Sequence, residues 1–167
     1  MIIVHHIEGG EFFLNNFCYA IKYSVHGSGG TSAEIVFLTG LFKQKQGWDS
    51  IVYFPDDAES CAKVGVAGVI TPPEKGGIDP WKLKLSLADL DVALMKNGKM
   101  IGAVLIVGGA EVVPFHRLPN PADDNDLEVL SDNPYATLDA NYYVPEWPVG
   151  RVTGEAGSEA GLLLTQL

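Results

Sequence analysis

The sequence predicts an α/β domain in which helices cover a mostly parallel sheet, and three observations support this prediction. The runs 48–54 and 101–107 are apolar, rich in β-branched residues and too short for core helices, so we expect two buried strands. A helical pattern over 79–97 lies between them, and a loosely alternating run, 17–25, precedes both. Strands that alternate with helices are typical of parallel sheets with helices on both faces.

The first half of the chain contains three further predicted elements. Apolar runs on either side of a glycine pair predict a β-hairpin extension within residues 1–16. Helical spacing and a capping hydroxyl predict a helix between 31 and 47. A short helix over 58–64 is expected to begin after Asp56 or Asp57, because either carboxylate can accept a hydrogen bond from the first helical turn.

The clearest helix begins at Asp79-Pro80, where a capping aspartate precedes a proline in the first turn. Its apolar residues fall on one face, which we expect to pack against the sheet: Leu83, Leu87, Leu90 and Leu94. Gly98 ends this helix, and the central strand follows at once. Residues 149–152 predict one more short strand, and 158–167 predict the start of another helix.

Composition excludes several classes of protein. The chain has 167 residues, of which 47% are hydrophobic, and a formal net charge of −10 without clustered basic residues, so nucleic acid is not an expected partner. No apolar run approaches the roughly 18 residues of a membrane span, and the N-terminus lacks the features of a signal peptide. Cys18 and Cys61 form no disulfide framework or metal-binding pattern. We therefore expect a soluble protein, and its compartment stays open.

The residues after the central strand form the most informative stretch of the sequence. The strand stops at Gly108-Gly109, and the segment 112–115 follows with the sequence Val-Val-Pro-Phe. Further along are 131–135, with the sequence Ser-Asp-Asn-Pro-Tyr, and the strand end Gly150-Arg151. Ligands of open α/β sheets bind beyond the carboxyl ends of the strands, so this stretch is in the right place to form a site.

These motifs, in this order, resemble those of the gingipain-type cysteine peptidases, a family of the caspase-like clan. The resemblance covers 104–151 and is much weaker before it. It implies a caspase-like three-layer α/β/α sandwich and the hydrolysis of peptide bonds after Arg or Lys. The family's catalytic His, in a Gly-His-Gly segment, and its catalytic Cys follow the strand that ends in Gly-Arg. Neither motif occurs within residues 1–167, so we expect the N-terminal part of a single, truncated caspase-like domain.

Several consequences of the resemblance concern individual residues. It places Asp132 at the floor of the pocket for the substrate residue before the cleaved bond, with Ser131 and Tyr135 as neighbouring substrate-binding residues. A carboxylate there can accept two hydrogen bonds from a guanidinium. The alternative is that Asp132 only orders its own turn. No residue of this chain is expected to be catalytic, and its partners are a peptide or protein substrate and the remainder of its own peptidase domain.

Other polar residues have weaker assignments. Asp124, Asp126 and Glu128 alternate as calcium ligands can, and gingipain-like domains do contain calcium sites. The alternative is a solvated acidic loop, and no cofactor is required for the expected chemistry. His116 does not correspond to the family's catalytic His. It can be a general base or ligand at the sheet edge, or have a structural or surface role.

Two other classes of function remain as alternatives. The chain can be a non-catalytic α/β interaction module that keeps a caspase-like fold. It can also be a flavodoxin-like domain that binds a nucleotide or small ligand through the glycine-rich segment 27–32, although the lysine of the usual phosphate-binding loop is missing. A downstream Gly-His-Gly segment and a strand-end Cys would favour the peptidase.

Overall fold

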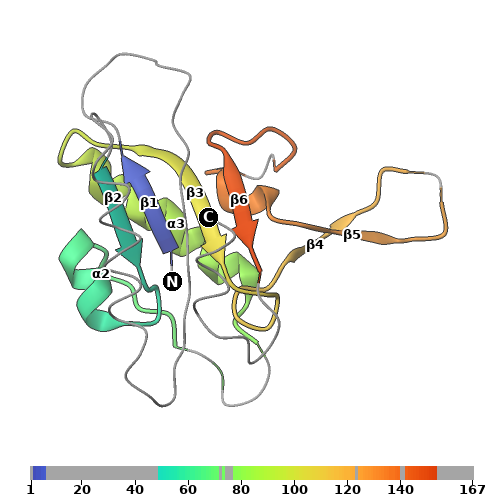
Figure 1. The fold of residues 1–167 in the computed structure, drawn as a ribbon, viewed down its shortest axis with the longest axis horizontal. Coiled ribbons are helices and arrows are strands. Elements are labelled where there is room, and N and C mark those ends of the chain that lie inside the picture. The colour runs from blue at the N-terminus through green and yellow to red at the C-terminus, as the bar shows by residue number, and fades with distance from the viewer. Residues whose placement is uncertain are drawn as a thin grey trace.

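A single four-stranded sheet forms the centre of the described structure (Figure 1). The computed structural model describes residues 2–6, 49–71, 73, 77–122, 124–139 and 142–153. The strands are β1 (Ile2–His6), β2 (Asp49–Tyr53), β3 (Ile101–Val107) and β6 (Val149–Val152), in the order β2-β1-β3-β6. Together with the helices beside the sheet, they confirm the α/β class.

The strand directions correct part of the prediction. β3 and β6 pair in parallel, with Val104 opposite Val149, whereas β1 runs antiparallel to both β2 and β3. The strands predicted at 48–54 and 101–107 are not direct neighbours, because β1 lies between them. Among the described strands, parallel pairing is limited to β3 and β6, so this part of the sheet is mixed rather than mostly parallel.

The N-terminal strand was predicted, but its position was not. β1 confirms a strand within residues 1–7, and it lies between β2 and β3 in the sheet. The predicted hairpin partner, the strand at 17–25, the helix between 31 and 47 and the helix from 158 lie outside the described residues. A pattern of apolar residues shows which segments are strands, but it does not show which strands are neighbours.

Both predicted helices of the middle region are present. In α2 (Ala58–Val64), the Asp57 carboxylate accepts a hydrogen bond from the Ser60 amide at 2.7 Å, and Gly65 ends the helix with a φ of +79°. In α3 (Pro80–Met95), the Asp79 carboxylate accepts from the Trp81 amide at 2.9 Å. The sequence therefore predicted both N-caps, which satisfy amide groups that have no partner inside the helix.

The core lies between α3 and one face of the sheet (Figure 1). The four leucines predicted to face the sheet are all buried, and they meet Tyr53, Val104 and Ile106 in one apolar cluster. The buried Asp91 carboxylate of α3 accepts a hydrogen bond from the Ile101 amide at 2.8 Å, which sets the start of β3 relative to the helix. Burial raises the pKa of Asp91. In the described ranges, no helix is long and apolar enough to cross a bilayer.

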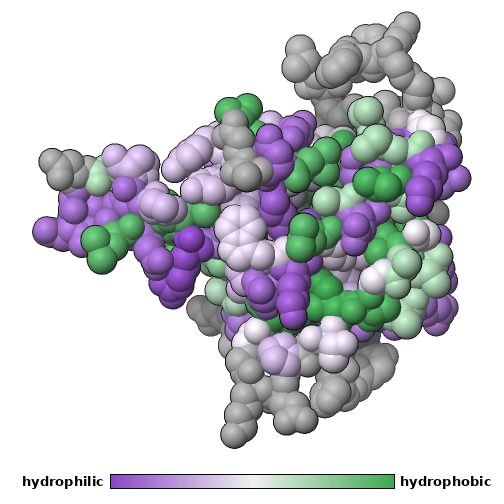
Figure 2. All heavy atoms as spheres, turned by 180° about the vertical axis from the view of Figure 1, so that it is seen from behind, coloured by the Kyte–Doolittle hydropathy of each residue, from purple (hydrophilic) through white to green (hydrophobic). Residues whose placement is uncertain are grey.

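A second, two-stranded sheet projects from the body. It consists of β4 (His116–Pro119) and β5 (Glu128–Ser131), which pair antiparallel, and we call residues 116–131 the β4–β5 arm. Figure 1 shows the arm extending away from the central sheet, and Figure 2 shows hydrophobic spheres beside hydrophilic ones on its surface. The sequence did not predict this hairpin. Its strands have four residues each. β4 alternates between buried and exposed residues over only that length, and β5 is exposed along most of it, so the periodic signal is too short to recognise.

Candidate functional site

The motifs that follow β3 meet at the carboxyl edge of the parallel strand pair. Arg151 of β6 is paired with Ile106 of β3, so both strands end at the same edge. The chain leaves β3 through Gly108, whose φ of +136° is one that residues with a side chain rarely adopt. The chain then turns back through Val113, and the short 3-10 helix η1 (Asn133–Ala136) returns another segment to this edge.

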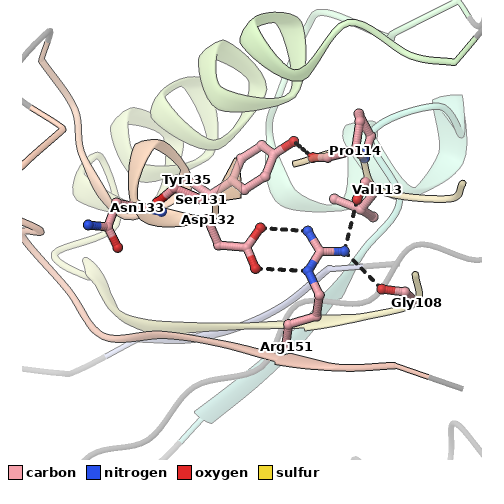
Figure 3. Close-up of polar contacts among 8 residues, drawn as sticks. All are labelled: Gly108, Val113, Pro114, Ser131, Asp132, Asn133, Tyr135 and Arg151. Atoms are coloured by element: carbon pink, nitrogen blue, oxygen red, sulfur yellow. Dashed lines mark hydrogen bonds and ion pairs between the residues drawn. The ribbon is translucent and has the colours of Figure 1, made fainter. Parts of the chain in front are cut away.

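The side chain of Arg151 holds these segments together (Figure 3). Its Nε and Nη2 donate to the two carboxylate oxygens of Asp132, at 2.8 and 2.6 Å, and its Nη1 donates to the carbonyl oxygens of Gly108 and Val113, both at 2.8 Å. The Phe115 ring lies over the guanidinium, with its centroid 4.1 Å from Cζ. We call these five residues the Arg151 clasp.

The electrostatics of the clasp are those of a buried, well-satisfied ion pair. The side chains of Arg151 and Asp132 are only 7% and 15% exposed. The planar guanidinium matches the carboxylate in a two-pronged contact, and the two carbonyl oxygens satisfy further N–H groups. Such satisfaction is needed because a charge removed from water is costly unless it is both paired and hydrogen-bonded.

The predicted substrate-binding residues do lie together, and each has a partner within the chain. Asp132 does not cap its own turn, since its side chain makes no capping bond to η1, so that alternative is wrong. Ser131 orders the turn instead, because its Oγ accepts a hydrogen bond from the Asn133 amide at 3.1 Å. Tyr135 is buried, and its hydroxyl donates to the Pro114 carbonyl at 2.6 Å. Burial raises the pKa of Tyr135, so this hydroxyl stays protonated.

Substrate binding by Asp132 stays a prediction with a new condition. Both of its oxygens already accept hydrogen bonds from Arg151, and the guanidinium charge offsets the carboxylate charge. A substrate Arg or Lys would therefore have to share this carboxylate with Arg151 or displace it. Sequence reasoning missed this internal partner, although the Gly-Arg strand end was among the motifs singled out.

The candidate calcium ligands lie on the β4–β5 arm and are exposed. The Asp124 carboxylate accepts from the Asn120 side chain at 2.7 Å and from the Asp126 amide at 2.9 Å, which orders the tip of the arm. Glu128 lies 3.3 Å from Arg117. Within the described part of the chain, no three His, Cys, Asp or Glu side chains form a group that could hold a metal. Calcium binding by Asp124, Asp126 and Glu128 stays a prediction.

His116 is fully buried at the root of the arm, between two aromatic rings. The ring centroids of Trp81 and Tyr135 lie 4.6 and 4.5 Å from that of His116, both in edge-on geometry. Neither ring nitrogen has a hydrogen-bond partner, and its exposed fraction is 0%. Burial, together with the nearby Lys84 ammonium, lowers the pKa of His116 to about 4. A neutral imidazole closed off from solvent cannot serve as a general base, so the structure favours the structural role.

Lys84 is a buried residue that sequence reasoning missed. It lies on the core side of α3, and its Nζ donates to the Thr137 carbonyl at 2.9 Å, the Thr137 hydroxyl at 2.6 Å and the Asp139 carbonyl at 2.5 Å. Burial lowers the pKa of Lys84. These bonds tie α3 to the segment after η1. Its spacing of three residues from Leu87, which puts it next to the leucine face of α3, was a sequence feature that could have indicated it.

Cys61 is the cysteine that falls within the described residues. Its side chain is buried on α2, with Sγ 3.7 Å from the Tyr53 hydroxyl, and burial raises the pKa of the thiol. A buried, protonated thiol is a poor nucleophile. Cys18 lies outside the described residues.

No protein-family model matches the chain, and no curated protein or solved structure matches it. Function is therefore inferred from the residues and their arrangement.

Proposed function

We propose that residues 1–167 form the N-terminal part of a gingipain-like cysteine endopeptidase domain with a caspase-like α/β/α architecture. One observation supports this proposal above the others: the motifs that carry the resemblance converge on Arg151. This side chain, from the Gly-Arg motif, bonds Gly108 of the glycine pair, Val113 before Pro-Phe, and Asp132. Gly108 and Arg151 are 43 residues apart in sequence. Unrelated chance matches would have no reason to meet around one guanidinium.

In this proposal the chain builds the scaffold and the remainder of the domain supplies the chemistry. The catalytic His and Cys belong to residues beyond 1–167 of a longer polypeptide. The Cys thiolate attacks the peptide carbonyl, the His moves the proton to the leaving amine, and backbone N–H groups hold the oxyanion. β3 and β6 end at the edge where ligands of α/β sheets bind, so the Arg151 clasp would form one wall of the substrate pocket.

In this proposal the three residues implied for substrate binding, Asp132, Ser131 and Tyr135, mainly form the wall of the pocket. Each carboxylate oxygen of Asp132 has a second lone pair after its bond to Arg151, so it can accept one further donor from a substrate Arg or Lys. Ser131 and Tyr135 hold the backbone around that carboxylate. The preference for Arg or Lys follows from the resemblance, and the offsetting charge of Arg151 predicts that it is modest.

The test uses the complete reading frame and residues 1–167 side by side. Reporter peptides that end in Arg, Lys or Glu are incubated with each protein in the presence of a reducing agent. We expect the complete protein to cleave after Arg and Lys, with activity abolished by iodoacetamide, and the 167-residue chain to be inactive. Turnover by the short chain that disappears in Cys61→Ala or Cys18→Ala would contradict the assignment. So would a complete protein that shows no thiol-dependent cleavage.

A second candidate is a non-catalytic α/β interaction module. Two observations favour it: the charge of Asp132 is offset within the chain, and the described cysteine is buried. The same experiment separates the two candidates, because a module lacks thiol-dependent hydrolysis in the complete protein. The glycine-rich segment 27–32, on which nucleotide binding would depend, lies outside the described residues.

A further inference from the structure

The β4–β5 arm exposes apolar side chains that a folded protein usually covers. Leu127 and Leu130 are 88% and 59% exposed, and Val129 is also exposed. One of them directly precedes β5 and two lie within it, and β5 extends away from the central sheet (Figure 1). Scattered apolar residues are normal on surfaces, but a group of them on a projecting hairpin indicates a surface that binds something.

The two faces of the arm differ. His116 and Leu118 are buried, and they alternate along β4 with exposed residues. Residues directly opposite in an antiparallel pair share a face, so Leu130 lies on the outer face beside its partner Arg117. The inner face anchors the arm to α3 and η1 through the rings around His116. Val129 is opposite the buried Leu118, so Val129 lies on the other face, and Leu127, two residues earlier, points the same way. Glu128 alternates with them and shares the outer face with Leu130.

The edge of β5 is suited to main-chain pairing. Among the described strands, β5 pairs with β4 alone, so its other edge has unpaired backbone groups. β4 ends at Pro119, and proline has no amide donor, whereas the sequence of β5 is Glu-Val-Leu-Ser without proline. Edge strands are usually protected by proline, charge or cover, and β5 has a single charged residue. An extended segment could therefore add to this edge as a third strand.

The charge of the arm restricts which segment fits. Residues 116–131 contain four acidic residues and one arginine, which give a formal net charge of −3 with His116 neutral. Two of the acidic residues, Asp126 and Glu128, flank the exposed Leu127. A second copy of the arm would bring like charges together, which opposes edge-to-edge pairing between copies. A basic segment would instead find opposite charge beside apolar contacts.

We propose that the β5 edge binds an extended segment of a partner polypeptide in which basic and aliphatic residues alternate. The partner's backbone pairs with β5. Its basic side chains lie on the face of Asp126 and Glu128, and its aliphatic side chains lie on the opposite face, beside Leu127 and Val129, because alternate residues of a strand point to opposite faces. This binding does not depend on the proposed peptidase activity, and it is measured without hydrolysis.

The probe is a fluorescein-labelled peptide of alternating Lys and Val, with a Glu-Val peptide and an N-methylated Lys-Val peptide as controls. Fluorescence anisotropy with the 167-residue chain measures their affinities. We expect the Lys-Val peptide to bind at least about tenfold tighter than either control, because one control has the wrong charge and the other cannot pair its backbone. Equal binding of the N-methylated peptide, or no binding of the Lys-Val peptide, would overturn the proposal.

Matched variants locate the binding surface. The double variant Asp126→Lys with Glu128→Lys should weaken binding of the Lys-Val peptide by about tenfold, since it reverses the charge beside the edge. Glu59→Lys, which reverses an exposed charge on α2, should leave the affinity within about twofold. Circular dichroism checks that each variant is folded. Loss of binding in Glu59→Lys as well would refute the assignment of the binding surface to the arm. A dimer of the chain in sedimentation, which dissociates in Leu130→Asp, would show that a second copy occupies the arm instead of a basic partner.

Discussion

Replacement of Asp132 by Asn tests whether the Arg151 clasp is a buried ion pair. The two side chains have nearly the same shape, so the change removes the charge and one acceptor while keeping the volume. Removing one partner of a buried pair typically costs about 3–5 kcal/mol, because the other charge is left uncompensated. Arg151 would keep its bonds to Gly108 and Val113, and the introduced amide would keep one acceptor oxygen, so we expect a loss of about 2–3 kcal/mol.

The assay is urea unfolding of the 167-residue chain, with a double-mutant cycle that uses Asp132→Asn and Arg151→Met. We expect the double variant to lose at least about 1 kcal/mol less than the sum of the single variants, because it leaves no charge unpaired. The exposed pair of Arg117 and Glu128 serves as control, with Arg117→Met and Glu128→Gln, and its coupling should stay below about 0.5 kcal/mol. A loss below about 0.5 kcal/mol in Asp132→Asn would refute the clasp and restore a free pocket carboxylate.

Three further predictions concern the core, the buried histidine and the thiol. Leu87→Ala should lower the free energy of unfolding by about 2–5 kcal/mol, because Leu87 is 2% exposed. The control Leu85→Ala, at a residue that is 63% exposed, should lower it by under about 1 kcal/mol. Equal losses in the two variants would contradict the packing of α3 against the sheet. The pKa of His116, at about 4, lies below the ordinary 6.5, so the unfolded chain takes up the proton first and stability falls as the pH drops from 6.5 toward 4. In urea titrations His116→Phe should remove that part of the slope, up to about 1.4 kcal/mol per pH unit, and an unchanged slope would show that His116 is not the group. In a Cys18→Ser variant, the remaining Cys61 should react with a thiol reagent only on unfolding, and fast labelling of the folded protein would show that the thiol is exposed.

Local chemistry made the middle of the fold predictable. The caps at Asp57 and Asp79, and the leucine spacing of α3, depend on residues a few positions apart, and the structure places each as expected. β3 and β6 were likewise indicated by their own composition. Such features depend on residues that are close together in the sequence, so they can be predicted from one sequence alone.

Long-range pairing was not predictable in the same way. β1 lies between β2 and β3, and the residues of β1 alone do not specify which strands are its neighbours. The contact between Asp132 and Arg151 joins residues 19 apart, and only the convergence of β6 and η1 on one edge brings them together. The arm was missed because a strand of four residues is too short for its alternation to be recognised, and the side chains of β5 are mostly exposed.

The most direct test of the proposed function is to identify the reactive cysteine of the complete protein. The complete reading frame is treated with a peptidyl chloromethyl ketone that ends in Arg, and the labelled cysteine is located by mass spectrometry. The proposal predicts one labelled cysteine, outside residues 1–167, with labelling slowed by competing Arg peptides. Labelling of Cys61 or Cys18, or no Arg-dependent labelling at all, would contradict the assignment of this chain to the scaffold of a cysteine peptidase.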